Sequence, residues 1–130
     1  MIVFLIFSCS SVAPQQKTDL LPNAQQEVVD HIDVQTLHQK MSQKPVIIDV
    51  RTTEEFSSGH LPTAKNIPLD ELENRLEGLT PHKTQEIFLV CATGRRSKRA
   101  TDLLRSKGFT QAINVEGGTR GWQAKGFPTE

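Results

Sequence analysis

Apolar residues along the chain fall into two repeating patterns. The first consists of short, nearly uninterrupted apolar runs at residues 46–50, 87–90 and 112–115, which are typical of strands buried on both faces. Residues 28–29 are expected to form a short edge strand, and residues 65–67 another short strand. Because these strands alternate with helix-like segments, the pattern favours an α/β domain with a parallel sheet covered by helices on both faces.

The second pattern is the three- or four-residue spacing of one helix face, found between the expected strands. The stripes are Val34, Leu37 and Met41; Leu72, Leu76 and Leu79; and Ala100, Leu103 and Leu104. Expected N-terminal caps are Asp33, Thr52 with Glu55, and Asp70 with Glu73. Expected helix stops are Gly59, Pro81 and Gly108. A last helix, entered by a tight turn at Gly117 and Gly118, is expected to bury Trp122.

Composition narrows the possible functions. With 130 residues the chain has room for one domain that buries its own core. Fifteen basic and fifteen acidic residues cancel, and only six Phe and one Trp occur, so nothing indicates a nucleic-acid partner. Two cysteines and four scattered histidines have no metal-binding spacing, so neither a metal nor another cofactor is expected. No apolar stripe requires a partner, and a monomer is expected.

The N-terminal segment has a composition of its own. Residues 1–7 are apolar and lead into Ser8 and Cys9, so residues 1–9 resemble a bacterial lipoprotein signal with Cys9 as the lipidated residue. The run is far shorter than the roughly 20 residues of a membrane span, and no Lys or Arg precedes it. The alternative is an uncleaved apolar tail with an incidental cysteine. Residues 10–27 are expected to form a flexible tether to a domain at residues 28–130.

This interpretation of the N-terminus also predicts a location. A lipid on Cys9 would anchor the domain to a membrane on the periplasmic side, and the alternative location is the cytoplasm. An oxidising compartment would also permit a disulfide between Cys9 and Cys91, which lipidation of Cys9 excludes.

One loop combines several features of a reactive site. Cys91 follows the expected strand at residues 87–90 and precedes a helix, so it lies at the carboxyl end of a strand, where α/β sheets usually bind ligands. Free amide groups and the positive end of the helix dipole stabilise an anion there. Four basic residues crowd the same helix start: Arg95, Arg96, Lys98 and Arg99. Each cation is unfavourable there by about 0.3–1 kcal/mol. The loop therefore indicates catalysis or anion binding, with a buried core cysteine beside a solvated basic face as the alternative.

Four ordered segments carry a resemblance to a known family. They are residues 49–51 (Asp-Val-Arg), 55–68, 91–97 (Cys-Ala-Thr-Gly-Arg-Arg-Ser) and 117–122 (Gly-Gly-Thr-Arg-Gly-Trp). The second is similar to the E-F-x-x-G-H-[IL]-x-x-A-x-N-[IL]-P run of rhodanese domains. Together they resemble the rhodanese-like sulfurtransferase family from about Val28 to the C-terminus.

The resemblance implies a rhodanese-like fold, with a central, mostly parallel five-stranded sheet between helices, and it implies the site residues. Cys91 is the expected nucleophile. The expected substrate-binding residues are Ala92, Thr93, Gly94, Arg95, Arg96 and Ser97. Asp49 and Arg51 are expected to support the loops through polar contacts, since a carboxylate in a buried strand needs a partner. The turn at Gly117 is expected beside the pocket, and His60 is expected to pack a turn rather than act as a base.

Loop length separates two kinds of chemistry. Four residues lie between Cys91 and Arg96, whereas cysteine-dependent phosphatases and arsenate reductases have five, which places Ser97 where those enzymes have an arginine. The shorter loop favours transfer of one sulfur atom through a Cys91 persulfide, from thiosulfate or a persulfide donor to cyanide or a thiol. The alternatives are a phosphatase or arsenate reductase, and a non-catalytic rhodanese-like binding module.

Overall fold

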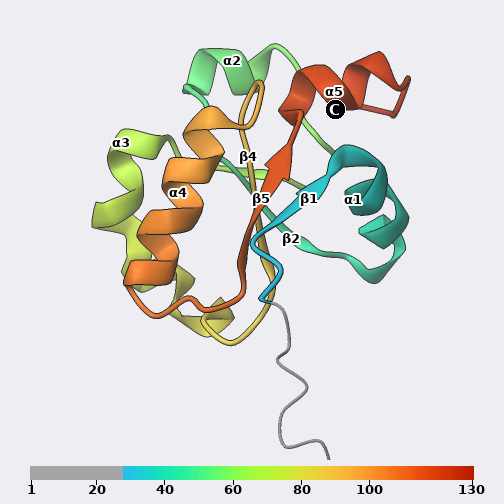
Figure 1. Ribbon diagram of the computed structural model, residues 1–130. Coiled ribbons are helices and arrows are strands. Elements are labelled where there is room, and N and C mark those ends of the chain that lie inside the picture. Colours follow the sequence, from blue (N-terminus) through green and yellow to red (C-terminus); the bar gives the residue numbers. More distant parts are fainter. Residues whose placement is uncertain (1–27) are drawn as a thin grey trace, which may run out of the picture.

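The computed structural model describes residues 28–130, which form a parallel five-stranded sheet with helices on both faces (Figure 1). The strands are β1 (His31–Asp33), β2 (Val46–Asp49), β3 (Lys65–Asn66), β4 (Ile87–Val90) and β5 (Ala112–Glu116), in the spatial order β1-β5-β4-β2-β3. The α/β class and the five-stranded sheet predicted from the sequence are confirmed. Residues 1–27, with the lipobox-like run, Cys9 and the tether, lie outside the described residues. Within residues 28–130, no helix combines the length and apolar character that crossing a membrane requires.

Alternation of side chains along the strands divides the core into two layers. The helices are α1 (Val34–Lys40), α2 (Thr53–Ser57), α3 (Leu69–Leu72), α4 (Arg95–Ser106) and α5 (Gly118–Ala124), with the 3-10 helices η1 (Met41–Gln43) and η2 (Glu73–His82). On one face, Ile48 and Leu89 pack against residues of α3, η2 and α4. On the other, Ile47 and Phe88 pack against α1 and α5, where Trp122 is fully buried as predicted. Each central strand is therefore covered on both sides.

The first strand lies further along the chain than predicted from the apolar pair Val28 and Val29. Val28 and Val29 are 66% and 55% exposed, and the strand begins at His31. It is held by backbone pairing to β5, next to a hydrogen bond of 2.8 Å from the Asn114 N–H to the Asp30 carbonyl. An edge strand of this kind is placed by its neighbour's hydrogen bonds and not by its own hydrophobicity, so the prediction of residues 28–29 was wrong.

The segment after β3 also departs from the prediction. Pro68 precedes the first helical residue of α3 with a φ of −52°, and Asp70 lies inside the first turn instead of capping it. The chain then continues as the 3-10 helix η2, which runs through Pro81 instead of ending before it. The predicted stripe is nevertheless buried or packed against the core: Leu72, Leu76 and Leu79. Apolar spacing thus identified the inward-facing residues but not the type of helix.

Candidate active site

Cys91 lies at the middle of the carboxyl edge of the sheet. It follows β4, which pairs with β2 on one side and β5 on the other, and it is 1% exposed. Residues 91–94 lead into α4, which begins at Arg95. In Figure 1 this loop stands at the same end of the sheet as α2 and the start of α5. The strand-to-helix position predicted for the cysteine is confirmed.

Hydrogen-bond donors converge on the Cys91 sulfur. The Gly94 nitrogen lies 3.0 Å from Sγ, and the Ser97 hydroxyl oxygen lies 3.3 Å from it. Burial by itself raises the pKa of the thiol. Hydrogen bonding from the Ser97 hydroxyl and from the N–H groups of Ser97, Gly94 and Thr93 outweighs burial, so the pKa is lowered from its ordinary value. The loop therefore stabilises a thiolate.

The start of α5 fixes the orientation of this loop. The Thr119 N–H donates to the Cys91 carbonyl at 2.8 Å, and the Arg120 N–H donates to the Ala92 carbonyl at 3.1 Å. A Cβ at Gly118 would overlap the Cys91 carbonyl oxygen and lie 2.7 Å from the Ala92 carbonyl carbon. Only a glycine allows so close an approach. Because α5 engages the loop carbonyls, the loop N–H groups are left to face the sulfur, and the turn at Gly117 and Gly118 lies directly against the cysteine loop.

Arg96 is held by an acidic residue that the sequence analysis did not assign to the site. Its two terminal nitrogens lie 2.7 and 2.8 Å from the two carboxylate oxygens of Glu55. The hydrogen bonds from Arg96 lower the pKa of Glu55 to about 2, and Glu55 in turn raises the pKa of Arg96. Glu55 also closes the capping box of α2 with Thr52, as predicted. The capping-box signal revealed only this local role, because the partner on α4 is distant in sequence.

Asp49 and Arg51 make polar contacts with each other and with neighbouring segments. Both are buried, and the Arg51 guanidinium donates to the Asp49 carboxylate at 2.7 to 3.0 Å. Arg51 also donates to the Gly59 carbonyl at 2.8 Å, and the Asn66 amide donates to the carbonyls of Asp49 and Arg51. This network holds β2, β3 and the turn after α2 together.

His60 packs a turn, as predicted. Its Nδ1 lies 3.0 Å from the Phe56 carbonyl oxygen, and its ring stacks on that of Phe56 with centroids 3.8 Å apart. In the described part of the chain, no group of three or more His, Cys, Asp or Glu residues is arranged to hold a metal ion.

Two hollows adjoin the loop. One, of about 480 Å³, is lined by Arg95, Arg96, Lys98 and Arg99. The other, of about 390 Å³, is lined by Val50, Thr52, Pro68, Leu69, Asp70 and Arg96. Arg96 thus lies between a basic hollow and a more apolar one. The predicted substrate-binding residues separate accordingly: Thr93, Gly94 and Ser97 contribute hydrogen bonds to the sulfur, the Ala92 carbonyl is engaged by α5, and Arg95 and Arg96 line the basic hollow.

This fold and site define an α/β domain whose single described cysteine is buried in a thiolate-stabilising loop at the edge of a parallel sheet. The chain belongs to the rhodanese-like domain family, whose model matches residues 33–125.

Relatives in this family include named sulfurtransferases. The human thiosulfate:glutathione sulfurtransferase is 36% identical over 92 residues, covering 61% of this chain and 79% of the relative. The structure of the human single-domain sulfurtransferase TSTD1 superposes with a TM-score of 0.69 at 32% identity, covering 75% of this chain and 97% of that one. Two proteins of Bacillus subtilis, YrkF and YqhL, are 40% and 39% identical, and the chain spans 42% and 64% of their lengths.

Proposed function

We propose that this protein is a sulfurtransferase that carries a sulfane sulfur as a persulfide on Cys91. The hydrogen-bond environment of the Cys91 sulfur is the main support for this proposal. The buried Cys91 sulfur lies within hydrogen-bond reach of the Gly94 N–H and the Ser97 hydroxyl, which favour an anionic sulfur at this position. Named sulfurtransferases among the relatives support the same class of activity.

The proposed reaction has two steps. The Cys91 thiolate attacks the outer sulfur of thiosulfate, an S–S bond to Cys91 forms, and the S–S bond of the donor breaks with its electron pair leaving on sulfite. A thiophilic acceptor, cyanide in the assay or a thiolate in the cell, then attacks the terminal sulfur and restores the Cys91 thiolate. Charge is conserved in both steps, and no outside oxidant or reductant is needed.

The basic hollow supports an anionic donor. Four cationic side chains surround it: Arg95, Arg96, Lys98 and Arg99. Two of them are already paired, Arg96 with Glu55 and Lys98 with Asp102. Arg95 and Arg99 take part in no ion pair within residues 28–130 and are proposed to attract the donor and stabilise departing sulfite.

The same loop argues against phosphoryl or arsenate chemistry. In those enzymes an arginine clamps the tetrahedral anion from the position that Ser97 occupies in this chain. Ser97 is fully buried, and its hydroxyl lies 2.6 Å from Asn114 Oδ1, so no cationic clamp reaches the sulfur from that side. A purely non-catalytic binding module would not require the donors that converge on Cys91.

Intact-mass measurement of residues 28–130 before and after exposure to thiosulfate tests the proposal. We expect a gain of one sulfur atom that cyanide removes, and no gain in the Cys91→Ser variant, whose thermal unfolding should stay close to wild type because the side chains are similar in size. Persistent turnover in Cys91→Ser contradicts the mechanism. If neither thiosulfate nor glutathione persulfide adds sulfur to the wild type, sulfur transfer is wrong, and hydrolysis of an aryl phosphate is measured next.

We also propose that Cys9 anchors the protein by a lipid on the periplasmic side of a membrane. The proposal is supported by the apolar run before Cys9 and the polar segment that follows it. Fractionation of cells that express the full chain tests it: the wild type should partition with membranes and Cys9→Ser should not. Equal partitioning of the two proteins contradicts the anchor.

A further inference from the structure

A buried asparagine on β5 shares the Ser97 hydroxyl with the catalytic sulfur. Ser97 Oγ lies 2.6 Å from Asn114 Oδ1 and 3.3 Å from Cys91 Sγ. Ser97 is 0% exposed, Asn114 6% and Cys91 1%, so bulk water does not replace these contacts. Cys91 comes from the cysteine loop, Ser97 from α4 and Asn114 from β5. Asn114 was not predicted as a site residue, because it is 17 residues from Ser97 in the sequence.

A hydroxyl group has only one proton to donate. Oδ1 of an amide accepts hydrogen bonds and cannot donate them, so Asn114 and the Cys91 sulfur compete for the proton of Ser97. The contact with Asn114 is the shorter of the two, within the usual range for O–H···O hydrogen bonds. When the proton points to Asn114, Ser97 offers a lone pair to the sulfur, which suits a thiol. When it points to the sulfur, it stabilises a thiolate or a persulfide anion.

We propose that Asn114 is a positioning residue that sets the direction of the Ser97 hydroxyl and thereby limits the hydrogen-bond support given to Cys91. The inference rests on the proposed role of Cys91 as the nucleophile. Such a restraint has a chemical use: nucleophilicity falls as a thiol becomes more acidic, and attack is most effective when the thiol pKa is near the ambient pH. Asn114 would keep the sulfur from being stabilised so strongly that it attacks or releases sulfur slowly.

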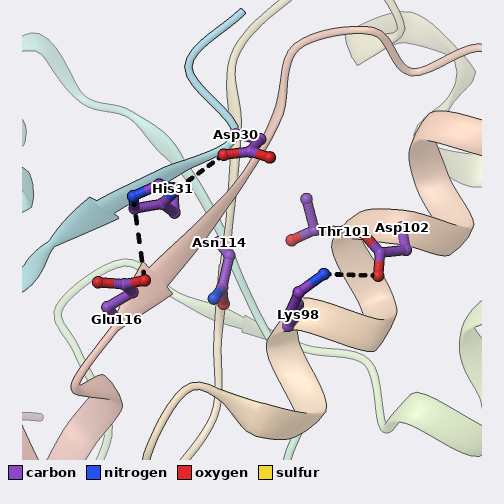
Figure 2. A pocket seen from close by; sticks show the side chains of 7 residues that line it. All are labelled: Asp30, His31, Lys98, Thr101, Asp102, Asn114 and Glu116. Atoms are coloured by element: carbon purple, nitrogen blue, oxygen red, sulfur yellow. Dashed lines mark hydrogen bonds and ion pairs between the residues drawn. The ribbon is translucent and has the colours of Figure 1, made fainter.

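Figure 2 shows the surroundings of Asn114, a pocket of about 60 Å³ between β1, β5 and α4. The charged or titratable groups that line it are Asp30 just before β1, His31 on β1, Glu116 on β5, and Lys98 and Asp102 on α4. His31 lies 2.7 Å from Asp30 and 4.0 Å from Glu116, and Lys98 lies 2.9 Å from Asp102. Arg96 is the further charged group that interacts with Cys91. Asn114 itself does not titrate, so its influence acts through hydrogen bonding.

The test measures the pH dependence of Cys91 alkylation by iodoacetamide, which needs no sulfur transfer and therefore fails independently of the proposed function. Asn114→Leu is similar in shape but cannot accept a hydrogen bond. At pH values below the midpoint of the alkylation profile, it should raise the thiolate fraction of Cys91 several-fold. Asn114→Asp, a stronger acceptor, should lower it about tenfold, as expected for one hydrogen bond of about 1.4 kcal/mol. His31, Lys98 and the other charged groups of the pocket are present in every variant.

The Ser97→Ala background separates positioning from other effects. In the Ser97→Ala background, Asn114→Leu should leave the midpoint of the alkylation pH profile unchanged. In the same background, Asn114→Asp should shift this midpoint only by the direct effect of the new charge on the Cys91 thiolate. Thr101→Val is the matched packing control, because Thr101 is buried and donates to the Ser97 carbonyl at 2.8 Å without contacting the sulfur; it should not move the midpoint. Midpoint shifts of the same sign in Leu and Asp variants, or shifts that persist unchanged in Ser97→Ala, overturn the inference.

Discussion

Replacing Gly118 by alanine tests whether the close approach of α5 holds the cysteine loop in its active geometry. Gly118 has a φ of +55°, and an L-residue in this region costs about 1 kcal/mol. The added Cβ would also overlap the Cys91 carbonyl oxygen and lie 2.7 Å from the Ala92 carbonyl. Restoring ordinary carbon–oxygen contacts of about 3.3–3.6 Å requires the loop to retreat by roughly 1 Å. Overpacking of this kind costs about 1–3 kcal/mol.

The expected loss of stability is therefore about 2–4 kcal/mol, which leaves a domain of ordinary stability folded. A displacement of about 1 Å at the reacting sulfur is expected to lower kcat/KM for thiosulfate about 100-fold. Gly126→Ala is the matched control, since Gly126 has a φ of +73° but no atom within 4 Å of its added Cβ. It carries the backbone strain without the clash.

Both quantities are measured on the same preparations, by urea unfolding and by the thiocyanate formed from thiosulfate and cyanide. We expect Gly126→Ala to lose about 1 kcal/mol and to keep its activity. If Gly118→Ala has wild-type activity, or loses no more stability than Gly126→Ala, the reasoning that α5 positions the loop is refuted.

Two further predictions concern buried and half-buried charges. Asp49→Ala leaves the Arg51 guanidinium, which is 7% exposed, without its carboxylate, and should cost about 3–5 kcal/mol in urea unfolding; a loss below 1 kcal/mol would contradict the structural role. Because Arg96 holds the pKa of Glu55 at about 2 instead of 4.5, the pair stabilises the fold above pH 4.5, and this stability is lost as the pH falls through 2. Since both side chains are about one third exposed (35% and 36%), solvent screening reduces the expected effect to about 1 kcal/mol. Urea unfolding between pH 6 and pH 2 should show this loss of stability in the wild type and not in Glu55→Gln. If the free energy of unfolding falls equally in both proteins over this range, the predicted contribution of the ion pair is wrong.

Local sequence predicted most of the fold and the centre of the site. Apolar runs identified β2, β4 and β5, because strands covered on both faces need continuous apolar residues. The capping signals at Asp33 and Thr52 gave the correct helix starts, because a cap acts on the N–H groups of its own first turn. Cys91 was placed correctly because a cysteine between a buried strand and a helix is a local feature.

Only the tertiary structure decided what the loop contacts. Glu55 reaches Arg96 because α2 and the start of α4 lie at the same end of the sheet, and Asn114 reaches Ser97 because α4 packs against β5. The Cys91 carbonyl is held by α5 for the same reason. These contacts join segments that the order of parallel strands brings together, and no local pattern encodes that order. The sequence thus determined which residue is the expected nucleophile, and the packing of α2, α5 and β5 around it determined how its sulfur is held.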